Sequence, residues 1–208
     1  MKLGAYLFAN EIDRQIAALS SVEYLQRIGR GKELQEELLP ISRLALHLKQ
    51  PGLEVEVEAF ENNGEADGHI RVTGFREQEF EVQVTCDFTY EESLRNEVLV
   101  SKGSVPGAGG IHRNKKSKEI LTTMATTDTY EHIGRVSQSV MELFRKKVAK
   151  PYSKNTALVI AFDAVKLYGS FNWCRLFASL EQAGGLSGSD FIAVYLFNSA
   201  TNELQRAA

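Results

Sequence analysis

The segment EADGHIRVTGFREQEFEVQVTC, residues 65–86, decides the fold. Apolar and polar residues alternate over 68–73 and again over 79–85, which predicts two strands joined by a hairpin loop at 74–78. In the second strand Glu81 and Gln83 share one face, while Val82 and its apolar neighbours share the other. A tight turn then brings Asp67 to the level of Gln83 and close to Glu81.

This polar row has two interpretations. An ordinary antiparallel strand with one face in water shows the same alternation. However, the apolar strands and amphipathic helices expected later in the chain need a sheet to cover, and a polar row inside a covered sheet is costly unless it binds something. Two neighbouring carboxylates repel each other, and a divalent cation removes that repulsion. Oxygen ligands on adjacent strands suit Mg²⁺.

The rest of the chain supplies helices and strands around this hairpin. Helical periodicity covers 5–28 and 32–48, the second run being interrupted by Pro40. A strand with glutamates on one face is expected at 53–59, followed by a turn at Asn62–Gly64. Further expected elements are a short helix or irregular segment at 91–100, a short strand or loop at 120–127, helices at 130–150 and 173–182, and buried strands at 157–162 and 191–197.

Length and composition fit one globular α/β domain, residues 32–208, preceded by an N-terminal helical extension, residues 1–31. The chain has 208 residues, of which 43% are apolar and 25% charged. No apolar run approaches the roughly 20 residues that span a bilayer, and the briefly apolar start is not typical of a signal peptide. Cys86 and Cys174 are expected to be buried thiols in a reducing compartment, so a cytoplasmic location without a membrane partner is expected.

Charge is unevenly distributed along the chain. Residues 102–154 contain eleven Lys or Arg and four acidic residues, although the whole chain has a net charge of -3. Within this span, residues 101–119 are rich in Gly, Ser and Lys and predict a long mobile basic loop. This uneven charge is either ordinary variation along a globular chain or a basic surface beside an acidic site. A basic surface suits a phosphate backbone, and an acidic site suits a divalent metal.

The pattern of Glu65-Ala66-Asp67-Gly68, a hairpin and then Glu81-x-Gln83 resembles the PD-(D/E)xK, or restriction-endonuclease-like, nuclease superfamily. The resemblance covers roughly residues 32–197 and implies an αβββαβ core with a mixed central sheet flanked by helices. Two departures are visible. Glu65-Ala66 replaces the Pro that precedes the Asp, and Gln83 stands where the family usually has Lys, although some active members carry Gln there.

The resemblance also implies roles for individual residues. Asp67, Glu81 and the Val82 carbonyl would hold Mg²⁺ or Mn²⁺, and Gln83 would orient the attacking water. Glu37, on the helix before the sheet, would bind a second metal or an outer-shell water. The implied function is Mg²⁺-dependent phosphodiester hydrolysis of nucleic acid, with DNA favoured over RNA.

Two groups of cations are candidates for nucleic-acid binding. Lys146 and Lys150 share a face at the end of the helix at 130–150, either as a phosphate clamp or as a solvated last turn that suits the helix dipole. The second group lies in the basic loop, which either orders on a nucleic-acid backbone or is simply solvated. Its members are Arg113, Lys115, Lys116 and Lys118.

A different class of function stays open. Gln83 in place of Lys, together with the acidity of the whole chain, is compatible with a catalytically inactive nuclease-fold protein that acts as a binding or regulatory module, in a setting such as bacterial or phage defence. A structural role is a third alternative, because the helical extension offers a surface for a homodimer.

Overall fold

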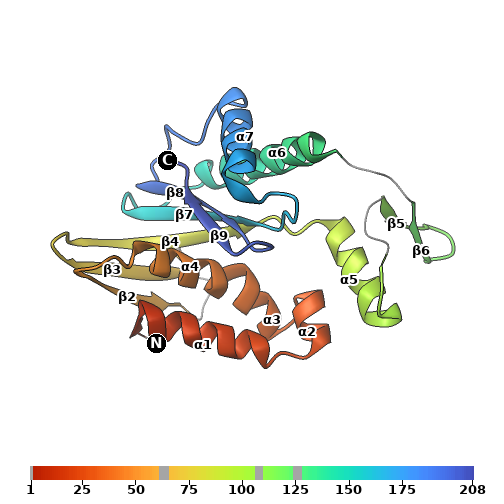
Figure 1. Ribbon diagram of the computed structural model, residues 1–208, viewed down its shortest axis with the longest axis horizontal. Helices are drawn as coiled ribbons and strands as arrows, with labels where there is room; N and C mark the ends of the chain where they lie inside the picture. The colour runs from red at the N-terminus through yellow and green to blue at the C-terminus, as the bar shows by residue number, and fades with distance from the viewer. Residues whose placement is uncertain (1, 61–65, 106–109, 124–127) are drawn as a thin grey trace.

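The computed structural model describes residues 2–60, 66–105, 110–123 and 128–208. Its centre is a seven-stranded sheet in the order β1-β2-β3-β4-β7-β8-β9 (Figure 1). The strands of this sheet are β1 (Lys2–Gly4), β2 (Leu53–Ala59), β3 (Gly68–Gly74), β4 (Gln78–Cys86), β7 (Thr156–Phe162), β8 (Ala193–Asn198) and β9 (Glu203–Arg206). The predicted mixed α/β class is confirmed.

Strand direction changes along the sheet. Strands β1 to β4 form an antiparallel series, β4, β7 and β8 run parallel, and β9 returns antiparallel to β8. Parallel neighbours need a crossover connection, which contains helix α6 (Thr129–Val148) between β4 and β7 and helix α7 (Gly169–Gln182) between β7 and β8. Strand β4 is therefore the junction between the antiparallel and parallel halves.

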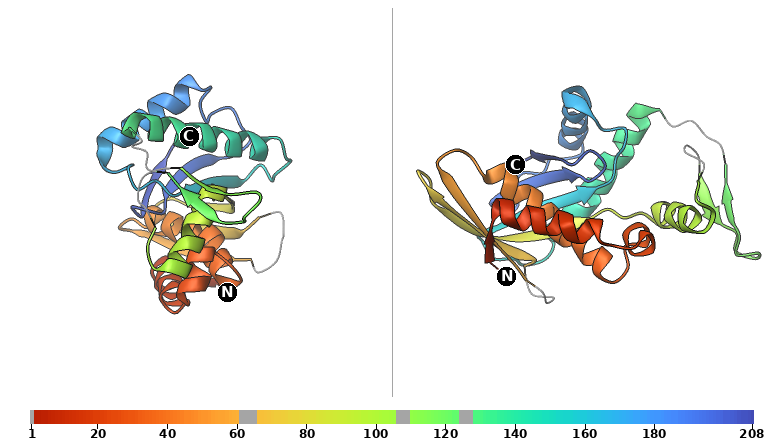
Figure 2. Two further views of the ribbon diagram at one scale, coloured as in Figure 1. Left: turned by 90° about the vertical axis from the view of Figure 1, so that its right-hand side faces the viewer. Right: turned by 60° about the horizontal axis from the view of Figure 1, so that its bottom comes forward.

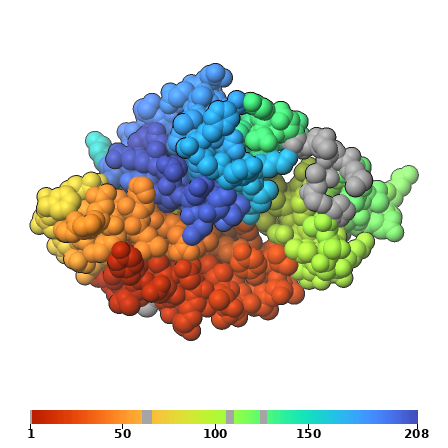
Figure 3. Space-filling view, viewed as in Figure 1, coloured from red at the N-terminus to blue at the C-terminus, as the bar shows by residue number. Residues whose placement is uncertain are grey.

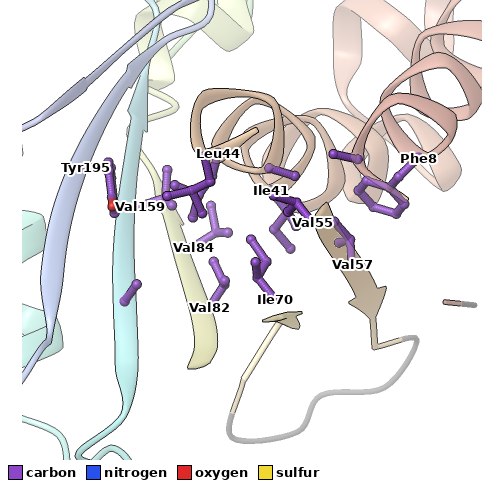
Figure 4. Packing of buried hydrophobic residues seen from close by; sticks show 14 of the residues in the cluster. Phe8, Ile41, Leu44, Val55, Val57, Ile70, Val82, Val84, Val159 and Tyr195 are labelled. Atoms are coloured by element: carbon purple, nitrogen blue, oxygen red, sulfur yellow. The ribbon is translucent and has the colours of Figure 1, made fainter. Parts of the chain in front are cut away.

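Helices cover both faces of the sheet. Helices α1 (Ala5–Ala17) and α4 (Leu39–Leu48) pack on one face, and α6 and α7 pack on the other (Figures 1 and 2). Figure 4 shows Phe8 of α1 and Ile41 of α4 packed toward Val57, Ile70 and other apolar residues of the strands. Strand β7 is buried along its whole length, as its apolar sequence predicts, because it lies between the two layers.

The helical run interrupted by Pro40 continues through a π-helical turn. Helix α3 (Arg30–Glu33) leads into η1 (Leu34–Leu38) and then α4. Pro40 has no N–H to donate to the Glu36 carbonyl, and this carbonyl instead accepts a hydrogen bond from the Cys86 thiol at 3.1 Å. The wider turn thus links the helix to the end of β4. Such turns are frequent at functional sites, and Glu37 lies within this one.

The segment expected as a mobile loop contains regular structure. Helix α5 (Tyr90–Lys102) extends into it, and β5 (Ile111–Arg113) pairs with β6 (Ile120–Thr122) in a separate hairpin. The loop expectation for 101–119 is corrected to this extent, because the apolar Ile111 and Ile120 pack with α5. Its mobility stays a prediction, and residues 106–109 and 124–127 lie outside the described part of the chain.

The N-terminal region is helical, as expected, and also contributes an edge strand. Strand β1 pairs with β2, α1 packs on α4, and α2 (Ser21–Gln26) begins with a capping box between Ser20 and Glu23.

Two local expectations concern other parts of the chain. The predicted turn at Asn62–Gly64 lies outside the described residues. The expectation that Cys174 is buried was wrong, because this residue is exposed on α7.

Helix α1 provides a test of the core. Phe8 is 1% exposed and Tyr6, on the opposite side of the same helix, is 62% exposed. We expect Phe8→Ala to lower the free energy of unfolding by about 3–5 kcal/mol, since a cavity opens between α1 and the sheet, and Tyr6→Ala to change it by less than about 0.5 kcal/mol. Urea denaturation of both variants measures the difference. Equal effects would mean that α1 does not pack as described.

Candidate functional site

The hairpin brings Asp67 next to Gln83. Gly68 is the first residue of β3 and pairs with Val82 of β4, and Asp67 directly precedes it. The Asp67 N–H donates to the Val82 carbonyl at 2.9 Å. Its carboxylate oxygen Oδ2 accepts from the Val84 N–H at 2.6 Å and from the Gln83 side-chain amide. The predicted proximity of Asp67 and Gln83 is confirmed.

Gly68 allows this hairpin to pack tightly against its surroundings. A Cβ atom at this position would lie 3.1 Å from the Glu58 carbonyl oxygen on β2 and 3.1 Å from the Ile41 Cδ1 atom on α4. Both contacts are tighter than ordinary van der Waals contacts. The small residue after Asp67 therefore lets α4 and β2 approach the strand that carries the carboxylate.

Burial dominates the electrostatics of Asp67. It raises the pKa of the carboxyl above its ordinary value, while hydrogen bonds from Val84 and Gln83 and the positive charge of Lys147 act in the opposite direction. The group is thus held in a site where its charge is poorly solvated. A further cation at this point would stabilise the ionised form.

Glu37 approaches the same site from the helical layer. Burial raises the pKa of Glu37, and the negative charge of Asp67 raises it further, followed by the charges of Glu33 and Glu36. Lys32 partly opposes these effects. The two carboxylates, predicted from sequence to share a site, are therefore close enough to repel each other.

Glu81 has a hydrogen-bond partner on the neighbouring strand β7. It lies on the same strand face as Gln83, and its Oε2 accepts a hydrogen bond from the Thr156 hydroxyl of β7 at 3.3 Å. Across β3 its neighbour is His69. Within the described part of the chain, no three His, Cys, Asp or Glu side chains are grouped as a metal site. The metal-ligand roles of Asp67, Glu81, Val82 and Glu37 stay predictions.

Lys147 is the site residue that the sequence analysis missed. Burial lowers the pKa of its amine, while the negative charges of Asp67 and Glu37 are among those that raise it. Its Nζ lies 5.8 Å from the centre of the Tyr152 ring. Positions 140, 144 and 147 fall on one helix face, so a lysine that continues the apolar stripe of Val140 and Phe144 was the available signal. Its half-buried side chain faces inward.

The other predicted cations have different environments. Lys146 and Lys150 are exposed at the end of α6 and beyond it, while Lys150 also influences the Lys147 amine. Arg113 forms an ion pair with Glu97 of α5 and donates to the Lys118 carbonyl at 3.1 Å. Arg113 thus stabilises the β5–β6 hairpin, while the neighbouring lysines 115, 116 and 118 remain exposed.

Comparisons of the chain with protein-family models, curated proteins and solved structures found no match. None of the helices in the described ranges is long and apolar enough to cross a membrane.

The raised pKa of Asp67 predicts a pH-dependent stability difference. The folded protein binds this proton more tightly than the unfolded chain, so the group's contribution is present below its ordinary pKa of 3.8 and is lost as pH rises through the raised value. Asn cannot titrate. We expect the unfolding free energy of Asp67→Asn, relative to wild type, to increase as the pH rises from about 4 to about 7. Urea titrations across this range measure the difference, and a constant difference would contradict burial of the charge.

Proposed function

We propose that this protein hydrolyses phosphodiester bonds of nucleic acid in a Mg²⁺-dependent reaction of the PD-(D/E)xK type. The observation that carries the proposal is the partly buried Asp67 carboxylate, which accepts hydrogen bonds from the Gln83 side chain and the Val84 N–H and interacts electrostatically with the half-buried Lys147. The succession α4, β2, β3, β4, α6, β7 also follows the αβββαβ order that the resemblance implies, with α5 and the β5–β6 hairpin inserted before α6. This order supports the finer, restriction-endonuclease-like fold.

The donor atoms near Asp67 suit a hard cation. Carboxylate and carbonyl oxygens are the ligands that Mg²⁺ prefers, and the ion commonly takes only one or two carboxylates and keeps several waters. Asp67 uses Oδ2 in hydrogen bonds to the protein, which leaves Oδ1 as its available donor. The Val82 carbonyl already accepts the Asp67 N–H, so its place among the ligands rests on the resemblance. Glu81 is the nearest acid on the same strand face, with Glu37 approaching from the helices.

Each side chain would then have a defined task. When bound, Mg²⁺ would lower the pKa of a coordinated water and polarise the phosphate. Asp67 and Glu81 supply negative charge to hold the cation. Gln83 orients the Asp67 carboxylate by donating to it from its side-chain amide, which also donates to the Val84 carbonyl at 3.3 Å, and its side-chain oxygen would accept from the attacking water. Lys147 supplies the positive charge that Gln83 lacks and would stabilise the charge developing on the phosphate.

A second candidate is a catalytically inactive binding or regulatory module. The Gln83 amide donates directly to Asp67, so the carboxylate has protein partners without a cation. Isothermal titration calorimetry separates the candidates. Binding of Mn²⁺ or Mg²⁺ that is lost in Asp67→Asn supports the hydrolase, whereas no metal binding by the wild type supports the inactive module.

Carboxylate variants test the catalytic residues. We expect Asp67→Ala and Glu81→Ala each to lower the rate of nucleic-acid cleavage by at least about 10²–10³-fold, because charge stabilisation at the reacting phosphate is lost. Glu79→Ala is the matched control, since Glu79 is exposed on the same strand face and pairs with His69 at 3.1 Å. Nuclease assays with Mg²⁺ or Mn²⁺ measure the rates, and circular dichroism checks folding. An inactive wild type, or full activity in both variants, would refute the hydrolase.

Neighbouring lysines test the source of positive charge. We expect Lys147→Met to lower kcat by about 10²-fold or more, because its amine acts beside the reacting group. Lys146 is exposed and lies one residue away. Because it is expected to contact a phosphate of the substrate, Lys146→Met should mainly raise KM. Steady-state kinetics of both variants give the two constants. The role of Lys147 fails if its removal changes KM alone or changes neither constant.

A further inference from the structure

The β5–β6 hairpin and helix α5 form an arm that projects from one end of the sheet (Figures 1 and 2). The space-filling view shows the hairpin at the margin of the molecule (Figure 3). The arm has its own small apolar cluster, separate from the two clusters that flank the sheet. Its members are Leu94, Val98 and Ile111, with Val105 and Ile120 packed against them. The hairpin is therefore held by α5.

Hydrogen bonds define the tip of the hairpin. The Asn114 side-chain oxygen accepts from the Lys116 N–H at 2.8 Å, and the Asn114 carbonyl accepts from the Lys118 N–H at 2.9 Å. The Asn114 N–H donates to the Glu119 carbonyl at 2.8 Å. These bonds set the turn before any partner is present, so less conformational freedom is lost on binding.

Positive charge is concentrated at this tip. Lys115, Lys116 and Lys118 are exposed, and their amines have no ion-pair partner among the residues that the structure describes. Arg113, by contrast, is paired with Glu97 on α5, which places its charge at the base of the hairpin. The arrangement presents three lysines outward on a structured turn, whereas a solvated loop would leave them without a fixed position.

We propose that the β5–β6 hairpin is a binding arm for double-stranded DNA, which seats in the major groove while its lysines contact the flanking phosphates. This inference rests on the proposed hydrolysis of nucleic acid and names its substrate class. The major groove of B-form DNA is about 12 Å wide and admits a two-stranded β-ribbon. The corresponding groove of duplex RNA is too narrow for side chains to enter.

Two further observations favour duplex DNA. Proteins that bind single strands stack bases on aromatic side chains, and residues 111–122 contain no Phe, Tyr or Trp. The arm is also near enough to share one duplex with the candidate site. Helix α5 has 13 residues and is about 20 Å long. It begins soon after the end of β4, and one turn of B-form DNA spans about 34 Å.

The N-terminal helices brace the arm at its base. Arg27 follows α2, lies 4.3 Å above the centre of the Phe88 ring just before α5, and has an ion-pair distance of 4.0 Å to Asp163 after β7. Helix α5 itself begins with a capping box formed by Thr89 and Glu92. These contacts join the start of α5 to the main body, so the hairpin extends from a fixed support.

Equilibrium binding tests the arm. Fluorescence anisotropy in EDTA would measure the affinity of the wild type for a duplex DNA, its single strand and a duplex RNA of the same sequence. We expect duplex DNA to bind at least about tenfold more tightly than the other two. In the triple variant Lys115→Gln/Lys116→Gln/Lys118→Gln we expect the affinity for duplex DNA to fall at least about tenfold. The slope of log K against log salt concentration should also become shallower by about 2–3, since each phosphate contact contributes about 0.9 to that slope.

The matched control is Lys2→Gln/Arg76→Gln/Arg206→Gln, which removes three exposed cations from the main sheet and the β3–β4 turn. Its affinity should stay within about twofold of wild type, as expected where no phosphate contact is lost. The proposed binding of duplex DNA by the arm is refuted if the two triple variants bind duplex DNA equally, or if the wild type prefers single strands or duplex RNA. Because binding is measured without metal, duplex binding through the arm with no cleavage in Mg²⁺ would refute hydrolysis alone.

Discussion

The arrangement of this molecule depends on the pairing of Gly68 with Val82, which fixes a carboxylate in a partly buried position on the sheet. This register aligns the backbone of β3 and β4 and aims Asp67 at Gln83 and the Val84 N–H. A shift by one residue would turn Asp67 to the opposite face, because side chains alternate along a strand. The apolar face of the same strands packs under α1 and α4, so the core enforces the register that the site requires.

Burial gives the carboxylate its chemical character. In water Asp67 would ionise readily, but here desolvation raises its pKa. The pKa of the nearby Glu37 is also raised, first by burial and then by the negative charge of Asp67. Lys147 offsets only part of this unfavourable charge. A site with two repelling carboxylates and one half-buried amine is suited to a divalent cation and a phosphate, and that balance underlies the proposed hydrolysis.

Much of the fold follows from alternation and apolar periodicity. Strands β2, β3, β4 and β7 lie close to their expected positions because each has a clear pattern and a packed face. The expectation failed for 101–119, where three-residue strands give little periodic signal and depend on contact with α5. The edge strand β1 was missed for a similar reason, since three residues paired to β2 carry no pattern of their own.

The candidate site was predictable where the sequence encodes it locally. Asp67 and Gln83 were placed together by counting through a hairpin, and Glu37 was assigned from the resemblance, on the helix before the sheet. Lys147 depends on the packing of α6 over β4 and β7, which local counting does not give, although its place on an apolar stripe was visible. Lys146 and Lys150, which were predicted from the sequence, are exposed, and their contact with phosphate stays a prediction.

The central claim is that Asp67 forms part of a divalent-metal site on the polar face of β4. Anomalous diffraction from crystals soaked in Mn²⁺ tests this most directly, because it locates the ion without relying on activity. We expect a peak bounded by the Asp67 carboxylate, the Val82 carbonyl and Glu81, at about 2.0–2.3 Å from its oxygen ligands. Data with no peak beside Asp67, while Mn²⁺ appears elsewhere on the protein, would contradict it.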